Sequence, residues 1–255
     1  MKKLKSLGVV AAATILLTSC LDGSNESSVA GCAVIDISTE AGIAAYVDDY
    51  SIPCYSPAFK DLTPGDCIYF TGTLNGDDPA NDGTKKYWTI SNAAVTQKFD
   101  RSGRFGMPLD TANIIPNEIA ATDMALLYLG QYSFTIKDYL FVGSSHEKAP
   151  SDQVNEYQLQ YDYNQEPQTV DGKRVYDFFL RVIKTSDGKG IVGTTPFYYT
   201  FNTHGYFKTL QSKETAAGNE TLSIRFNYIK EFNKDTTDAT WGKSQIITIQ
   251  IPKES

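Results

Sequence analysis

Histidine and serine side chains are the first candidates for chemistry, and they are few. The chain has two histidines, His146 and His204, and neither has a carboxylate or a cysteine at a spacing typical of metal ligands. Ser144 lies two residues before His146, but a catalytic triad needs side chains that converge from separate parts of a fold. The sequence contains no GxSxG or P-loop motif. We interpret segment 143–146 as a polar loop and predict no catalytic residue and no cofactor.

Acidic residues are the next candidates. Segment 75–83 (NGDDPANDG) is rich in the oxygen ligands that calcium prefers. The EF-hand spacing needs an oxygen ligand where Ala80 stands, and no glutamate follows at the right distance. We therefore favour a solvated hairpin loop and predict no metal site. Paired carboxylates hydrolyse glycosides, but the adjacent Asp48 and Asp49 should point apart in a loop.

Cys20 is the residue with the most specific chemistry. Three lysines precede the uncharged apolar segment 7–17, which is shorter than the roughly 20 residues that cross a bilayer. This pattern is typical of a secretory signal, and segment 17–20 (LTSC) resembles the lipobox of bacterial lipoproteins. We predict a signal peptide over 1–19, lipidation of Cys20 and a flexible Ser/Asn/Gly-rich tether over 20–32. Plain secretion is the alternative.

The residues after Cys20 indicate the destination. Leu21 follows the cysteine, in place of an aspartate of the kind that retains lipoproteins at the inner membrane. We expect a lipid anchor in the outer membrane, facing the periplasm or the cell surface. The lipid is the only membrane contact that the sequence predicts.

The other cysteines are Cys32, Cys54 and Cys67. Their odd number allows at most one disulfide within the chain, and export makes one permissible. Cys54 and Cys67 would close a short loop. Burial of the three as small apolar side chains is the alternative.

Composition limits the class of partner. The 255 residues carry a net charge of -7, and removal of the three lysines of segment 1–19 leaves -10. Nucleic-acid binding requires a basic face, so we predict no nucleic-acid partner. The 16 tyrosines and 13 phenylalanines suit either glycan stacking or a β-rich core. We expect Trp88 and Trp241 to pack in the core or in hairpins.

Alternating patterns predict an all-β fold. Strands expected at 33–38, 43–47, 66–74 and 87–99 fit a small OB-like β-barrel over 33–100. Segment 101–121, with its glycines and prolines, is the expected linker, with a short helix near 117–121. Alternation at 157–163, 222–228 and 247–251, with a segment at 174–184 that is apolar on one face and mixed apolar on the other, predicts an antiparallel β-sandwich over 122–255.

These motifs together resemble one known family. The lipobox, the segment "DLTPGDCIYFTGTL" with its return strand "YWTISNAAVTQ", and the later "DYLFVG" and "LSIRFNYIKEF" are similar to NigD-like lipoproteins of Bacteroidales. The resemblance implies an N-terminal OB-like domain and a C-terminal β-sandwich. It implies no catalytic residues, and its link to a bacteriocin operon suggests an immunity or accessory role.

The sequence leaves the function open between classes. Our first hypothesis is a non-enzymatic lipoprotein of the outer membrane that binds a protein or a glycan of the cell envelope. The alternatives are an envelope glycan hydrolase with paired carboxylates and a bacteriocin immunity factor.

Overall fold

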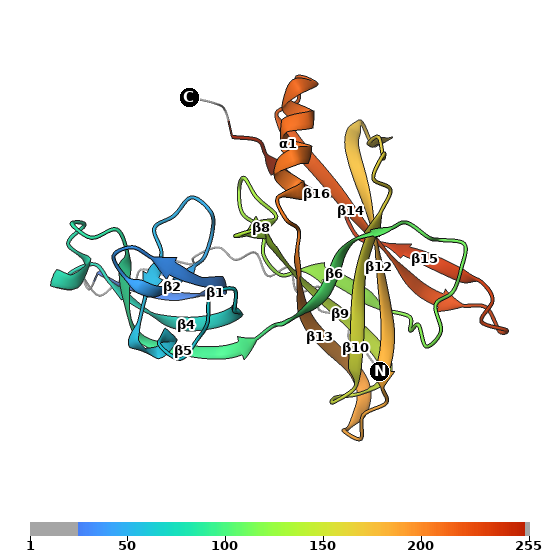
Figure 1. Ribbon diagram of the computed structural model, residues 1–255, viewed down its shortest axis with the longest axis horizontal. Helices are drawn as coiled ribbons and strands as arrows, with labels where there is room; N and C mark the ends of the chain where they lie inside the picture. Colours follow the sequence, from blue (N-terminus) through green and yellow to red (C-terminus); the bar gives the residue numbers. More distant parts are fainter. Residues whose placement is uncertain (1–24, 253–255) are drawn as a thin grey trace, which may run out of the picture.

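The computed structural model describes residues 25–252, which form a small β-barrel followed by a larger curled β-sheet (Figure 1). The predicted signal peptide 1–19 and the predicted lipidation site Cys20 lie outside the described residues. No helix within residues 25–252 has the length and apolar character needed to span a bilayer.

Five strands close the barrel. They are β1 (Glu26–Ser38), β2 (Gly42–Tyr46), β3 (Cys54–Tyr55), β4 (Cys67–Asn75) and β5 (Trp88–Lys98). Their order is β1-β2-β3-β5-β4, and only the β3–β5 pair is parallel. The predicted OB-like barrel is therefore confirmed. Two short 3-10 helices, η1 (Pro57–Phe59) and η2 (Pro79–Asn81), lie in its connections.

Alternate side chains of the strands fill the interior of the barrel. Ala33 and Ile35 of β1 point inward and pack with Ile68 and Phe70 of β4. Phe59 of η1 meets Phe70 edge to face, with ring centroids 5.4 Å apart. The side chains between these positions point out of the barrel, toward the curled sheet.

The barrel begins earlier than the sequence pattern indicates. Strand β1 starts at Glu26 and pairs with β4 from Glu26–Asn75 through Val34–Cys67. The predicted tether over 20–32 is therefore wrong from residue 26 onward. The polar segment forms a strand because its backbone hydrogen bonds to β4 stabilise it, although its side chains show no strand pattern.

Eleven strands make the second body. They are β6 (Asp100–Pro108), β7 (Asp123–Leu126), β8 (Thr135–Ile136), β9 (Tyr139–Pro150), β10 (Val154–Tyr161), β11 (Gln168–Val170), β12 (Lys173–Ser186), β13 (Val192–Asn202), β14 (Thr221–Phe232), β15 (Ala239–Lys243) and β16 (Ile247–Gln250). The main path runs β15-β14-β12-β10-β6-β13-β9-β7, with β11 on β12, β16 on β14 and β8 on β9.

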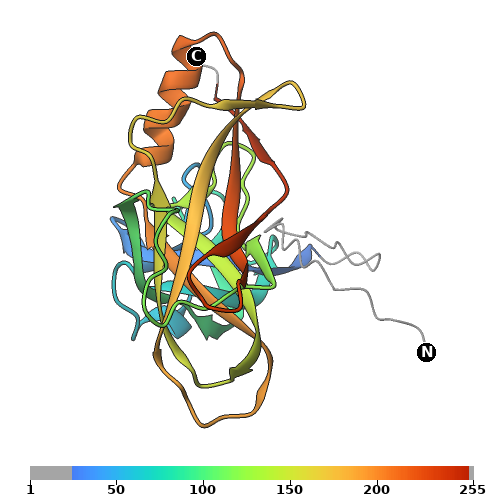
Figure 2. The same ribbon diagram turned by 90° about the vertical axis from the view of Figure 1, so that its right-hand side faces the viewer.

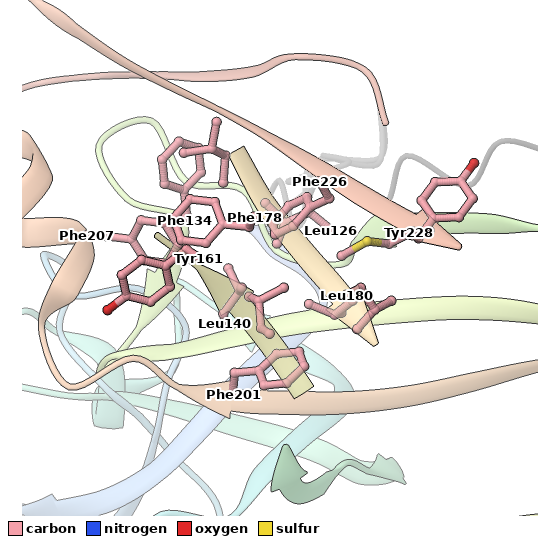
Figure 3. Close-up of a cluster of buried hydrophobic side chains, with 14 of the residues drawn as sticks. Leu126, Phe134, Leu140, Tyr161, Phe178, Leu180, Phe201, Phe207, Phe226 and Tyr228 are labelled. Atoms are coloured by element: carbon pink, nitrogen blue, oxygen red, sulfur yellow. The ribbon is translucent and has the colours of Figure 1, made fainter. Parts of the chain in front are cut away.

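The curled sheet folds over its own core. Aromatic and aliphatic side chains from both ends of the strand path meet inside it, including Phe134, Leu140, Phe178, Phe201 and Phe226 (Figure 3). The all-β prediction of a barrel followed by a sandwich-like body is confirmed. The strands are not all antiparallel, however, because β6 runs parallel to β10 and β13, and β12 runs parallel to β14.

The expected linker over 101–121 is wrong, because it belongs to the sheet. Its first residues form β6, and residues 109–121, here called the strap, run along the sheet as an irregular segment with a turn at 116–117. Ile119 donates a backbone hydrogen bond to the Val182 carbonyl at 2.9 Å, and Ala121 donates one to Ile229 at 2.8 Å. The helix expected near 117–121 is absent from the strap for this reason.

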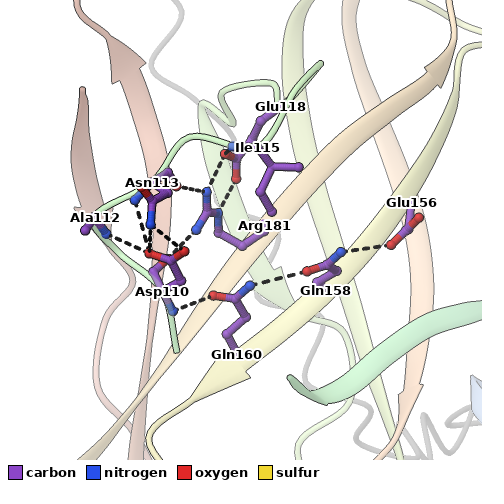
Figure 4. Close-up of polar contacts among 9 residues, drawn as sticks. All are labelled: Asp110, Ala112, Asn113, Ile115, Glu118, Glu156, Gln158, Gln160 and Arg181. Carbon is purple, nitrogen blue, oxygen red and sulfur yellow. Dashed lines mark hydrogen bonds and ion pairs between the residues drawn. The ribbon is translucent and has the colours of Figure 1, made fainter. Parts of the chain in front are cut away.

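A buried ion pair holds the strap in place. Arg181 of β12 is 1% exposed, and its guanidinium donates to both carboxylate oxygens of Glu118 (Figure 4). The same group donates to the carbonyls of Asp110 and Asn113. The Glu118 carboxylate also accepts the N–H of Ile115 at 3.0 Å.

Helix α1 (Tyr206–Ala216) lies at one end of the curled sheet (Figures 1 and 2). It buries Phe207 and Leu210 in the main core. Its Glu214 is 1% exposed and accepts hydrogen bonds from Arg174, from Tyr176 and from Asn219. The sequence analysis did not predict this helix, because two apolar positions in a polar stretch give little periodic signal.

The barrel and the sheet share an apolar contact. Cys32, Cys67 and Phe99 pack there with Tyr128 and Phe141 of the sheet. The Phe99 and Phe141 rings lie edge to face at 5.1 Å. The two bodies are therefore joined by packed side chains as well as by a continuous chain.

Candidate functional site

A cleft of about 420 Å³ opens beside this apolar contact. The barrel lines it with residues 34–36 of β1, Asp49 and Gly65, and the sheet lines it with residues 137–139 and Lys208 of α1. We call it the junction cleft. Its charged side chains come from both bodies, so a ligand seated in it would contact both at once.

A tight turn carries the cleft's central charges. Lys137 and Asp138 connect β8 to β9 and have φ values of 48° and 66°. A two-residue hairpin turn with positive φ at both positions is normally occupied by Asn-Gly or Asp-Gly. Here the turn holds two charged side chains in a conformation that costs free energy for non-glycine residues.

Asp49 connects this turn to the barrel. Its carboxylate accepts the backbone N–H of Lys137 at 2.6 Å. Its other oxygen lies 3.6 Å from the ammonium of Lys208. The neighbouring Asp48 turns away and accepts the hydroxyl of Ser51 at 2.6 Å, so the two adjacent carboxylates point apart as expected.

The two lysines each bridge the bodies. Lys137 lies 3.4 Å from the Asp36 carboxylate and 3.9 Å from the centroid of the Tyr46 ring. Lys208 lies 3.2 Å from Asp138, and its side chain is 60% exposed. Partial burial alone would lower the pKa of Lys208, but the hydrogen bond and charge of Asp138 and the charge of Asp49 outweigh it and raise this pKa. Lys208 is therefore charged at neutral pH.

Tyr50 follows the cleft residue Asp49 in the chain, and Arg101 and Tyr139 lie close to the cleft residue Gly65. Tyr50 and Tyr132 meet edge to face at 5.8 Å, and Tyr50 is 62% exposed. At Gly65 a side chain would collide with the Arg101 guanidinium at 2.9 Å and the Tyr139 hydroxyl at 3.2 Å. Glycine therefore lets these two donor groups approach the barrel backbone.

The candidate residues from the sequence lie elsewhere. Ser144 and His146 are buried on β9, not in a loop, so that interpretation is wrong. The Ser144 hydroxyl and His146 Nε2 are 2.8 Å apart, and Nδ1 is 2.8 Å from the Ala120 carbonyl. Burial lowers the pKa of His146, and the bond to Ala120 only partly opposes this. The pair connects β9 to the strap and has no access to a substrate.

His204 is exposed in the turn before α1. Its backbone N–H donates to Asn202 Oδ1 at 3.0 Å. Within residues 25–252, no cluster of three or more His, Cys, Asp or Glu side chains could hold a metal ion.

The 75–83 segment uses its polar side chains on its own backbone. Asp78 caps η2 by accepting the Ala80 N–H at 2.8 Å. The buried Asn81 donates to the carbonyls of Asn75 and Thr89 and accepts the Thr89 N–H. These contacts account for the polar sequence without a cation.

The cysteine and tryptophan side chains pack against other residues of the fold. Cys32, Cys54 and Cys67 are buried and free, and burial raises the pKa of each to about 12. Trp88 packs on the barrel core. Trp241 of β15 lies 5.3 Å from the Phe179 ring and 5.7 Å from the Arg181 guanidinium.

Sequence reasoning missed Lys137, Asp138 and Lys208. One local signal was present, since the pair Lys137–Asp138 separates two short apolar segments and could have indicated a hairpin. Nothing in the sequence connects that turn to Asp49, which lies 88 positions away.

Comparison with known proteins places this fold. The crystal structure of an uncharacterized protein from Parabacteroides merdae ATCC 43184 matches 88% of this chain and 100% of its own length, with a TM-score of 0.72 and 28% identity. The two proteins share one fold. No family model and no curated protein matches the chain.

Two further solved structures are less similar. A predicted lipoprotein from Bacteroides fragilis NCTC 9343 has a TM-score of 0.48 and 11% identity, over 90% of this chain and 100% of its own. A NigD-like immunity protein from Bacteroides caccae ATCC 43185 has a TM-score of 0.41 and 12% identity, over 84% of this chain and 90% of its own. A NigD-like protein is therefore among the structural neighbours of the chain.

Proposed function

We propose that this chain is a lipoprotein of the outer membrane that binds an envelope glycan in the junction cleft and catalyses no reaction. The observation that carries the proposal is the cleft itself, in which charged side chains of two bodies face one accessible volume of about 420 Å³. This volume lies in the range of small-ligand sites.

The chemistry of the cleft favours a polar ligand with many hydroxyl groups. Lysine ammonium groups donate and carboxylates accept, so Lys208, Lys137 and Asp36 offer both kinds of partner within one site. The exposed ring of Tyr50, next in the chain to the cleft residue Asp49, supplies a surface on which a sugar ring can stack. A protein partner of mixed charge is the alternative outcome of the binding test.

The same contacts disfavour hydrolysis. A glycosidase needs one carboxyl group that is protonated as a general acid. In the cleft, Asp36, Asp49 and Asp138 each already form an ion pair with a lysine ammonium within 4 Å, so none of the three is an unpaired carboxyl group. The immunity role stays a prediction of the family resemblance.

Membrane fractionation tests the proposed lipid anchor. The Cys20→Ala variant cannot be lipidated, so it should leave the membrane fraction and become soluble. Membrane association that persists in this variant would contradict the proposed anchor.

A binding assay tests the cleft. The purified Cys20→Ala chain is titrated with fragments of peptidoglycan and of outer-membrane polysaccharide. We expect Lys208→Glu to lose binding, while Lys234→Glu, a matched change at an exposed lysine far from the cleft, keeps it. Equal binding by both variants would exclude the junction cleft, and capture of an envelope protein instead of a glycan would reassign the partner.

A further inference from the structure

The first described residues are fixed to one end of the barrel. Asn25 accepts the Gly76 N–H with its backbone carbonyl at 2.9 Å, and its side chain donates to Asp77. Glu26 opens β1 opposite Asn75 and accepts a hydrogen bond from the Asn75 side chain. The chain therefore enters the fold beside the β4–β5 connection, residues 76–87.

The distance to the predicted anchor is short. Only residues 21–24 separate Cys20 from Asn25, and five Cα steps of at most about 3.6 Å span no more than about 18 Å. With a tether of this length, the barrel end that holds Asn25 cannot move far from the lipid headgroups. The predicted tether of 20–32 would have allowed more than twice this reach.

The opposite end of β1 lines the junction cleft. Val34 lies eight residues after Glu26 on the same strand, which corresponds to about 26 Å at the usual rise of a β-strand. The curled sheet extends farther, and Figure 1 shows the β14–β15 hairpin at the end of the molecule opposite the β4–β5 connection.

From this geometry we infer that the β4–β5 connection is the membrane-facing surface of the protein. The barrel then acts as a spacer that holds the junction cleft away from the bilayer. The inference rests on the lipidation of Cys20 proposed above.

The surface chemistry fits a layer of zwitterionic phospholipid headgroups. The connection exposes both acidic and basic side chains, among them Asp77, Asp82, Lys85 and Lys86. Such a mixture can meet the phosphate and ammonium groups of one headgroup layer. The connection has no exposed large apolar residue to insert into the bilayer, so the short tether, and not intrinsic affinity, keeps it there.

Energy transfer on vesicles tests the orientation apart from lipidation. The mature chain carries a hexahistidine tag in place of Cys20 and binds zwitterionic vesicles that contain a nickel-chelating lipid and an acceptor dye on the headgroup. A donor dye is attached to a cysteine introduced at Lys85→Cys or, as the matched distal control, at Lys234→Cys. The three native cysteines stay unlabelled because they are buried.

We expect efficient transfer from position 85 and weak transfer from position 234. Insertion of roughly 20 Gly/Ser residues before Leu21 should remove the difference, since such a linker is a flexible coil. Equal transfer from both positions with the native tether would overturn the inference, as would a difference that survives the insertion. Fractionation of Cys20→Ala in cells tests the lipidation alone, and the vesicle experiment tests the orientation alone. A failure of one claim can therefore be told apart from a failure of the other.

Discussion

The junction cleft and the strap are both organised by ion pairs, but they differ in access to solvent. Arg181 and Glu118 are 1% and 0% exposed in their side chains, and the Arg181 guanidinium donates hydrogen bonds to Asp110, Asn113 and Glu118 of the strap. In the cleft, the side chains of Lys208 and Asp36 are 60% and 42% exposed.

This difference in exposure distinguishes an ion pair that stabilises the fold from one that can bind a ligand. A buried pair that loses one member leaves an uncompensated charge in a low-dielectric interior. An exposed pair contributes little to stability and can exchange its partner for a ligand. The same residue types therefore hold the fold in one place and offer a binding surface in the other.

The largest expected effect comes from breaking the buried pair. Arg181→Met should lower the free energy of unfolding by about 3–5 kcal/mol, because Glu118 is left buried and unpaired. Urea unfolding measures the loss. The double variant Arg181→Met/Glu118→Leu should recover part of it, and a double variant that is less stable than the single one would contradict this account.

Separating the two bodies should have the next largest effect. Phe141→Ala removes a fully buried ring from the apolar contact beside the cleft, and such truncations cost about 3 kcal/mol or more. In the wild type we expect trypsin to spare Arg101 and Arg104, because both lie in β6. Phe141→Ala should expose Arg101 to cleavage, and early cleavage there in the wild type would show that β6 is not held by the sheet.

A smaller effect concerns pH. The folded-state pKa of His146 lies below its unfolded value of about 6.5, so the unfolded chain binds the proton first as the pH falls. The contribution of His146 to stability should be constant above about pH 6.5 and should decrease below it.

The comparison of urea midpoints at pH 7.5 and 5.5 measures this decrease. His146→Gln should remove most of it, while His204→Gln, a change at the exposed histidine, should leave it intact. A decrease of the same size in both variants would assign it to other groups.

The smallest stability effect is expected in the cleft. Lys208→Ala removes two exposed ion pairs and should change the free energy of unfolding by no more than about 1 kcal/mol. A loss as large as that of Arg181→Met would show that the cleft, like the strap, serves only the fold.

The sequence predicted those parts of the molecule in which the side-chain pattern is local. The strands at 157–163, 222–228 and 247–251 alternate clearly, and short strands follow one another closely in the barrel, so the all-β class and the OB-like barrel could be predicted. The strap could not be predicted, because its backbone is held by hydrogen bonds to Val182 and Ile229 that no local pattern encodes. The first half of β1 was missed for the same reason.

The candidate site was harder to predict than the fold. Asp49, the Lys137–Asp138 turn and Lys208 come from three distant segments and meet only when the barrel packs against the sheet. Ser144 and His146, which looked reactive because they are close in sequence, are buried in a strand. Proximity along the chain was therefore a poor guide to accessible chemistry.

Hydrogen exchange with and without an envelope glycan tests the central claim most directly. The account predicts that binding protects the amides around Asp49, around the Lys137–Asp138 turn and in the first turn of α1, and leaves the strap unchanged. Two results would contradict the assignment of the junction cleft as the binding site. One is protection of amides in the strap alone, and the other is glycan binding that leaves the exchange of the cleft amides unchanged.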